Sequence, residues 1–225
     1  MMLDPPIKWA YHHYNSKICG NAMPNLCKDI EIELGFLQAL EKGEVISQLK
    51  LSKQLRVSVG MVNALVKRAA LKGYVKARSA PAKRYAYYLT PEGFSQKSRL
   101  VAEYIDISLH FFRNARSQYF DLFTREQSQG YKNFILYGNG ELTEIAILAA
   151  LEAGINIKGI VCASCSAERI CGVVVVSDLE MIKDYDCIVL VDQREPQAAY
   201  DKLAQCGLVH VVRTPPILGV EKRFN

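Results

Sequence analysis

The spacing of apolar residues predicts three short helices in the first third of the chain. Apolar side chains recur every three or four residues over 29–42, which predicts the first helix. Ser47 and Ser58 each precede a further periodic stretch, and a serine side chain is well suited to cap the start of a helix. Gly73 follows the last of these stretches as a C-terminal stop. Only the dipeptide Arg56-Val57 separates the second helix from the third, which predicts a tight turn.

A β-hairpin and a long helix are predicted to follow. Residues 74–78 and 83–89 flank the turn 79–82 and have the composition of a strand pair. Thr90 and Pro91 are typical of a helix start, and the helical pattern continues to about residue 126. The apolar positions of this helix approximate a heptad repeat, for which we favour a seam between two copies of the chain over packing on its own subunit. The seam consists of Val101, Tyr104, Ile105, Ser108, Phe112, Ala115, Tyr119 and Leu122.

The pattern changes after Ser128-Gln129-Gly130, which we interpret as a linker. Short and almost wholly apolar runs now alternate with helical stretches, as in a parallel sheet covered by helices. The predicted strands span 134–137, 157–161, 173–176, 187–191 and 209–212, and the predicted helices span 142–153, 178–182 and 196–206. The ligand cleft of such a sheet lies at the carboxyl ends of its strands.

Charge separates the same two halves. Residues 1–129 hold 19 basic and 11 acidic side chains, whereas residues 130–225 hold 9 basic and 12 acidic ones. The segment 45–91 contains no Asp or Glu, although about five would be expected from the average composition. Its basic residues are Lys50, Lys53, Arg56, Lys67, Arg68, Lys72, Lys76, Arg78, Lys83 and Arg84. A surface of this kind attracts a polyanion such as DNA.

The third helix has one face suited to reading DNA. Its buried stripe is predicted to contain Val62, Leu65, Val66 and Ala69. The opposite face presents Gly60, Asn63 and Lys67, with Arg68 beside them. An amide side chain can bind adenine through two hydrogen bonds, and a lysine reaches guanine or phosphate. The small Gly60 permits a close approach to the duplex.

This half contains the stretch Val57-Ser58-Val59-Gly60-Met61-Val62-Asn63 and the stretch Leu89-Thr90-Pro91-Glu92-Gly93. These two motifs resemble the MarR-type winged helix, and more narrowly the branch associated with exopolysaccharide gene clusters. The resemblance covers roughly residues 30–110, and it implies a DNA-binding dimer. It places Ser58, Gly60, Asn63, Lys67 and Arg68 on the recognition helix and Arg78, Lys83 and Arg84 on the wing. The chain departs from the family at Arg56, where a glycine is common and a left-handed backbone costs about 1 kcal/mol.

Residues 131–216 resemble the small Rossmann domains that bind CoA or nucleotides, including those that precede sugar-modifying acyltransferases. The order of the two halves is similar to that of the Rex redox repressors, although the long C-terminal helix of Rex is missing. Gly138-x-Gly140 lies between a strand and a helix and offers backbone N–H groups to an anion. The acidic residue that would hold the ribose of NAD is absent after the second strand, so the usual NAD pose is not expected. The predicted ligand-binding residues are Gly138, Asn139, Gly140, Glu141, Ser164, Asp192 and Thr214.

Cysteines and the N-terminal arm add little to this interpretation. Cys162, Cys165 and Cys171 follow the second predicted strand, where they could form a redox or metal site. We favour small core or loop residues instead, because no fourth metal ligand is evident. Residues 1–28 show no periodicity and are interpreted as a poorly ordered arm. The seven cysteines have no framework-like spacing, which suggests a reducing compartment, and no secretory signal or membrane span is expected.

The sequence therefore predicts an α/β two-domain protein. A winged helix (α+β) over 29–95 and a linking or dimerisation helix over 96–128 are followed by a doubly wound, parallel-sheet, Rossmann-like domain over 131–225. We expect a cytoplasmic, homodimeric transcription regulator, connected with polysaccharide biosynthesis through the resemblance, that binds double-stranded DNA. Its sheet domain would sense a small molecule with a phosphate or nucleotide moiety, and the cofactor is unknown. Two alternatives remain: a nucleotide-sugar-modifying or NAD(P)-dependent enzyme, for which no Tyr-x-x-x-Lys motif is present, and a non-catalytic scaffold.

Overall fold

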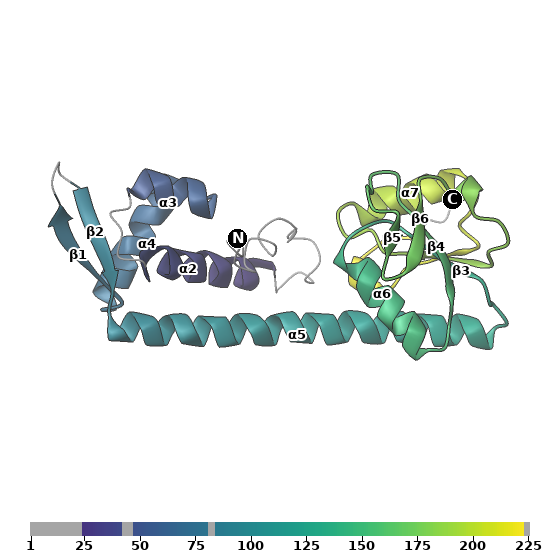
Figure 1. Ribbon diagram of the computed structural model, residues 1–225, viewed down its shortest axis with the longest axis horizontal. Coiled ribbons are helices and arrows are strands. Elements are labelled where there is room, and N and C mark those ends of the chain that lie inside the picture. Colours follow the sequence, from purple (N-terminus) through teal and green to yellow (C-terminus); the bar gives the residue numbers. More distant parts are fainter. Residues whose placement is uncertain (1–23, 42–46, 81–83, 223–225) are drawn as a thin grey trace. The chain divides into compact units, whose positions relative to one another are not determined.

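The computed structural model describes residues 24–41, 47–80 and 84–222 (Figure 1). They form two compact units whose boundary lies between Leu109 and His110. Each unit has a hydrophobic core of its own. Most of the predicted N-terminal arm, residues 1–23, lies outside the described residues, whereas its last residues already belong to a helix.

The first unit has the order of elements of a winged helix. It consists of α2 (Pro24–Glu41), α3 (Gln48–Leu55), α4 (Val59–Leu71), β1 (Val75–Ala80), β2 (Arg84–Leu89) and the first half of α5 (Pro91–Ser128). The two strands pair in antiparallel register from Val75 opposite Leu89 to Ala80 opposite Arg84. The helix-turn-helix and the hairpin predicted from the sequence are therefore present.

Capping residues fix the ends of these helices as predicted. The Ser47 hydroxyl accepts a hydrogen bond from Lys50 N at 3.2 Å, and the Ser58 hydroxyl accepts one from Met61 N at 3.1 Å. Arg56 adopts the left-handed conformation, with φ 54°, so a non-glycine residue does occupy the turn. The Thr90 hydroxyl accepts a hydrogen bond from Gly93 N at the start of α5, and it also donates one to the carbonyl of Gly73.

Gly93 is needed where α5 meets the end of α4. A Cβ added at this position would lie 2.1 Å from the carbonyl oxygen of Tyr74, a distance that real side chains do not reach. The core of the unit then forms between α2, α3, α4, the hairpin and α5. It includes Phe36, Leu37, Leu40, Leu51, Leu55, Val62, Leu65, Val75, Tyr87 and Leu100.

The second unit contains a six-stranded sheet with the strand order β5-β6-β4-β3-β7-β8. The strands are β3 (Phe134–Tyr137), β4 (Ile157–Val161), β5 (Arg169–Ile170), β6 (Val173–Val176), β7 (Cys187–Leu190) and β8 (Val212–Arg213). All neighbours are parallel except β5 and β6, which form an antiparallel edge that the sequence did not predict. The chain builds outward from β3 to β6 on one side and then returns to β7 and β8 on the other.

Helices cover both faces of this sheet. Figure 1 shows α6 (Glu141–Glu152) and the end of α5 on one face, with α7 (Pro196–Gln205) on the other. Two short 3₁₀ helices, η1 (Leu179–Met181) and η2 (Pro216–Leu218), lie in the connections. The parallel order with a reversal between β3 and β7 is that of a doubly wound Rossmann-like sheet, as predicted.

The second half of α5 belongs to the core of this unit, which corrects the predicted seam. Tyr119 is fully buried and donates a hydrogen bond to the carbonyl of Leu190 at 3.0 Å, and burial raises the pKa of its hydroxyl. The Phe123 ring contacts the Phe134 ring edge to face, with 5.5 Å between the centroids. Ala115, Tyr119 and Leu122 therefore cannot form a dimer seam, because the sheet of their own subunit already covers them.

Two predicted boundaries also differ from the structure. The helix predicted to link the domains over 96–128 is divided between the two units instead of standing apart from them. The last strand contains only Val212 and Arg213, whereas 209–212 was predicted.

The guanidinium of Arg213 donates a hydrogen bond to the buried Glu126 carboxylate at 2.7 Å. Partial burial lowers the pKa of Arg213, but the hydrogen bond and negative charge of Glu126 outweigh this effect and raise the pKa overall.

Candidate DNA-contact surface and ligand cleft

One face of α4 is exposed along its whole length. Val62, Leu65 and Ala69 point into the core. The predicted reading face is accessible at every position: Ser58, Gly60, Asn63, Lys67 and Arg68 are all exposed. A Cβ added at Gly60 would meet only the Ser58 hydroxyl, at 3.8 Å, so the surface of this unit is open there.

Two apolar residues of α4 were not predicted to belong to this surface. Val59 and Met61 occupy the first turn of the helix and are 43% and 45% exposed. The N-terminal residues of a recognition helix are those that reach base edges, and apolar side chains contact the methyl group of thymine. Helical spacing alone did not reveal this exposure, because Val59 lies three residues before Val62 and Met61 lies four residues before Leu65.

Two of the three predicted wing residues lie on the described strands of the hairpin. Arg78 is exposed on β1, and its guanidinium lies over the Tyr88 ring, 5.5 Å from the centroid. Arg84 is the first residue of β2 and pairs with Ala80 across the hairpin. Lys83 belongs to the tip, 81–83, which lies outside the described residues.

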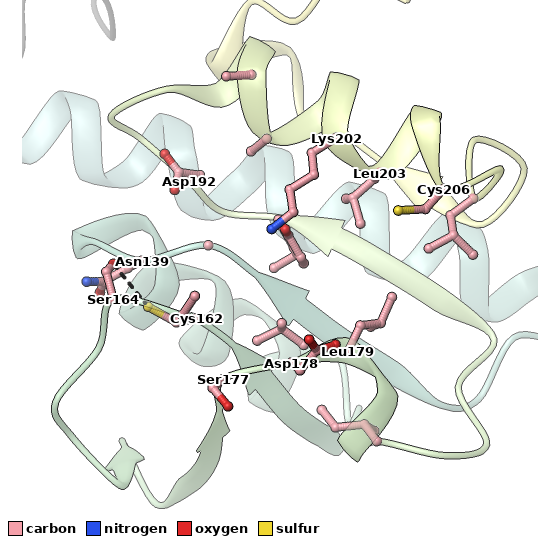
Figure 2. Close-up of a pocket in the computed structure, with 18 of the residues that line it drawn as sticks. Asn139, Cys162, Ser164, Ser177, Asp178, Leu179, Asp192, Lys202, Leu203 and Cys206 are labelled. Atoms are coloured by element: carbon pink, nitrogen blue, oxygen red, sulfur yellow. Dashed lines mark hydrogen bonds between the residues drawn. The ribbon is translucent and has the colours of Figure 1, made fainter.

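The second unit contains a cleft of about 730 Å³ at the carboxyl ends of its central strands (Figure 2). Tyr137 and Val161 end β3 and β4, Ser177 directly follows β6, and Asp192 follows β7. The helix α7 forms a further wall through Ala198, Ala199, Lys202 and Leu203, with Cys206 directly after it. The cleft thus includes the reversal point between β3 and β7, where ligands of doubly wound sheets bind.

The cleft brings together four of the seven predicted ligand-binding residues. Gly138, Asn139, Ser164 and Asp192 line it. Gly140, Glu141 and Thr214 do not belong to its lining, so the structure does not place these three with the others. Thr214 follows β8 at the edge of the sheet, one strand beyond the reversal point.

A side chain of the protein itself fills the space beside Gly140. Gln193 is 3% exposed, and its amide oxygen accepts a hydrogen bond from Leu142 N at 3.2 Å in the first turn of α6. A Cβ on Gly140 would lie 2.5 Å from the Gln193 amide carbon, which explains the need for glycine at this position. The amide oxygen therefore occupies one backbone N–H at the N-terminus of α6, the kind of site at which helices bind anions. The glycine turn therefore accommodates an internal glutamine, which the sequence did not predict.

The charge of the cleft also differs from that of a phosphate site. Its lining contains the carboxylates Asp178, Glu180, Asp192 and Glu195 and a single basic side chain, Lys202, which extends from α7 in Figure 2. Asp192 accepts hydrogen bonds from the backbone of Arg194 and Glu195, and this holds its carboxylate in place. An excess of carboxylates repels phosphate and favours ammonium and hydroxyl groups.

A disulfide bond forms part of the cleft wall. It joins Cys162 to Cys165, whose Cα atoms are 5.6 Å apart, a bond that the favoured interpretation as small core or loop residues did not include. Cys171 and Cys206 are free and exposed, and Cys206 also lines the cleft. Burial raises the pKa of the Cys187 thiol to about 12 and keeps it protonated. Within the described ranges no group of three or more His, Cys, Asp or Glu side chains is arranged to hold a metal ion.

The solved structures similar to this chain share little of its sequence. No family profile and no curated protein sequence matches it. Among solved structures it is similar to MepR, a transcription regulator of the Staphylococcus aureus multidrug efflux pump MepA, with 12% identity, a TM-score of 0.34, and coverage of 43% of this chain and 82% of MepR. It is also similar to the O-methyltransferase NcsB1 of neocarzinostatin biosynthesis, with 9% identity, a TM-score of 0.26, and coverage of 90% of this chain and 67% of the enzyme. A third similar structure, PigF with SAH, has 13% identity, a TM-score of 0.23, and coverage of 94% of this chain and 63% of PigF.

Across the part of the chain that the structure describes, no helix has both the length and the apolar character needed to span a bilayer.

Proposed function

We propose that this protein is a DNA-binding transcription regulator that reads its site with α4. The observation that supports this proposal is the exposed face that presents Asn63, Lys67 and Arg68 on an acid-free segment. Asn63 would read a base in the major groove and Lys67 would neutralise a phosphate or reach guanine. The hairpin with Arg78 would contact the backbone or the minor groove beside it.

The test is a binding experiment with randomised duplex DNA, followed by anisotropy titrations of the selected site at several salt concentrations. Asn63→Ala is expected to relax the base preference at one position of each half-site. Lys67→Ala is expected to weaken binding to every sequence and to lower the slope of log K against log salt by about one. Lys158→Ala is the matched control, because Lys158 is exposed on β4 of the other unit. An unchanged base preference in Asn63→Ala, or no binding of the unaltered protein at low salt, would exclude this reading role.

We propose further that the sheet unit senses a small molecule in the 730 Å³ cleft without catalysing a reaction. The position of the cleft at the reversal point supports ligand binding. Gln193 occupies the N-terminus of α6, and the cleft lining contains four carboxylates but only one basic side chain, Lys202. We therefore propose a ligand that places hydroxyl or amine groups in the cleft and keeps any phosphate outside it. Binding would change the DNA affinity through α5, which contributes to both units.

We propose that the regulator acts as a homodimer through the first half of α5. A palindromic site needs two recognition helices held at a fixed spacing. Ile105 and Leu109 are one helical turn apart on α5, and they are 50% and 45% exposed. We propose these two side chains as the contact with a second copy, since Ala115, Tyr119 and Leu122 further along the helix are already buried.

A further inference from the structure

We propose that Cys162 and Cys165 form a redox-active pair that thiols reduce reversibly, and that the redox state of this pair controls the mobility of the cleft wall. The disulfide lies at the carboxyl end of β4, and Figure 2 shows Cys162 next to Ser164 and Asn139 at one side of the cleft. Only the connection to ligand sensing rests on the function proposed above. The thiol chemistry and the mobility of the wall depend on neither DNA nor a ligand.

One half of the pair is anchored to the sheet. Cys162 N donates a hydrogen bond to the carbonyl of Val176 on β6 at 2.8 Å. The carbonyl of the preceding Val161 accepts one from Gly138 N at 3.0 Å, which connects this strand end to the glycine turn. The backbone on the Cys162 side is therefore held by two neighbouring segments, whatever the state of the disulfide.

The other half belongs to a loop. Cys165 is half-buried in the connection 163–168 between β4 and the short edge strand β5, and the other side chains of this connection are exposed. Ala163 and Ser164 lie between the two cysteines and line the cleft. The disulfide closes these residues into a small ring, so its cleavage removes a covalent restraint from part of the ligand site.

The exchange reaction has a defined direction of attack. Cys162 is only 7% exposed, so an incoming thiolate reaches the Sγ of Cys165 more easily. A new S–S bond forms between the reductant and Cys165, the Cys162–Cys165 bond breaks, and the Sγ of Cys162 leaves as a thiolate. The Ser164 hydroxyl lies 3.7 Å from this sulfur and is able to donate a hydrogen bond to it. The second thiol of a dithiol reductant then releases Cys165, so two protein thiols form and the reductant becomes a disulfide.

The first measurement uses the full chain equilibrated in dithiothreitol buffers of graded redox potential, with differential isotopic alkylation and peptide mass spectrometry. As the buffer becomes more reducing, we expect Cys162 and Cys165 to become alkylated together, with a single midpoint potential. The disulfide should form again when the protein is returned to an oxidising buffer. Cys171→Ser and Cys206→Ser are matched controls that should leave the midpoint unchanged. The proposal is overturned if the pair resists reduction until the protein is denatured, if it is already a dithiol without reductant, or if Cys171→Ser abolishes disulfide formation.

The second measurement follows the wall itself by hydrogen–deuterium exchange. On reduction we expect amides over 163–168 to exchange about tenfold faster, while peptides from α6 remain unchanged. Cys165→Ser should show the fast rate both with and without reductant. If reduction leaves the exchange of 163–168 unaltered, the disulfide does not control the wall, whatever the protein does on DNA.

Discussion

Single residues determine the shape and the charge of the cleft. The glycine turn 138–140 was predicted from its spacing between a strand and a helix, and both Gly138 and Gly140 have positive φ. The spacing did not reveal that Gln193, more than fifty residues later in the chain, would fill the space beside Gly140. A glycine in a sequence indicates that the backbone adopts an unusual φ or that another group lies close to it, but it does not identify that group. The local sequence around the glycine turn therefore could not indicate the residue that occupies the space beside it.

The excess of carboxylates in the cleft can be measured without knowing the ligand. Cys206 is a free, exposed thiol in the lining, whereas Cys171 is a free, exposed thiol outside it. A cationic methanethiosulfonate should modify Cys206 faster than an anionic one, because carboxylates attract the cation. At low salt, the ratio of the cationic to the anionic rate should be about threefold larger at Cys206 than at Cys171. The rates are measured by mass spectrometry on variants that retain only one of these two thiols.

Glu180→Gln combined with Glu195→Gln removes two of these charges while keeping the side-chain size, and the preference at Cys206 should fall toward that at Cys171. Both side chains are exposed, so these changes do not disturb the core. If the anionic reagent reacts faster at Cys206, the cleft has a positive potential and a phosphate ligand becomes the better proposal.

At the scale of elements, local signals predicted the first unit well. The predicted helix ends are formed by the expected residues. The side chains of Ser47, Ser58 and Thr90 cap helix starts, and Gly73 adopts a positive φ after the end of α4. Each of these signals depends on neighbours within four residues, so it can be recognised in sequence. The seam on α5 was different, because helical periodicity shows which face is apolar but not which surface covers it. One stretch of the helix packs on the sheet, and only the stretch before it retains exposed apolar side chains.

That remaining stretch makes the dimer proposal testable. Ile105→Glu combined with Leu109→Glu should convert a dimer into a monomer in sedimentation velocity, because two carboxylates would be buried in an apolar seam. DNA affinity should fall at least about tenfold, since two linked half-sites bind more tightly than one. Glu103→Lys changes the charge at an exposed position on the opposite side of α5 and should preserve the dimer. A double variant that sediments like the unaltered protein would mean that any dimer forms elsewhere.

At the scale of the whole molecule, the boundary between the units lies within a continuous helix. Composition and the linker-like Ser128-Gln129-Gly130 placed the start of the sheet domain near residue 131, whereas the structure places it near His110. The difference has a physical cause. Residues 110–128 continue the helix that begins in the first unit, but their buried side chains pack in the core of the second unit. Tyr119, Phe123 and Glu126 contact strands or strand ends of the second unit, and no local signal in a helix reports such long-range contacts.

Two fragments distinguish these boundaries. The fragment 110–225 should fold and unfold cooperatively in a thermal melt followed by circular dichroism, because it retains the helix that covers the sheet. The fragment 131–225 should show no cooperative transition. It lacks Tyr119, Leu122 and Phe123, whose burial stabilises by about 1.5–3 kcal/mol each, a sum comparable with the total stability of a small domain. It also leaves the partly buried Arg213 without the Glu126 carboxylate.

An intermediate variant tests whether the helix acts through these contacts. Tyr119→Phe in the fragment 110–225 removes only the hydrogen bond to the carbonyl of Leu190, so it should lower the free energy of unfolding by about 1 kcal/mol and keep the transition cooperative. Equal melting temperatures for the fragments 110–225 and 131–225 would show that α5 does not stabilise the sheet. In that case residues 110–128 would be free to move relative to the sheet, and a signal from the cleft would lose its direct connection to the helix that leads to the DNA-contact surface.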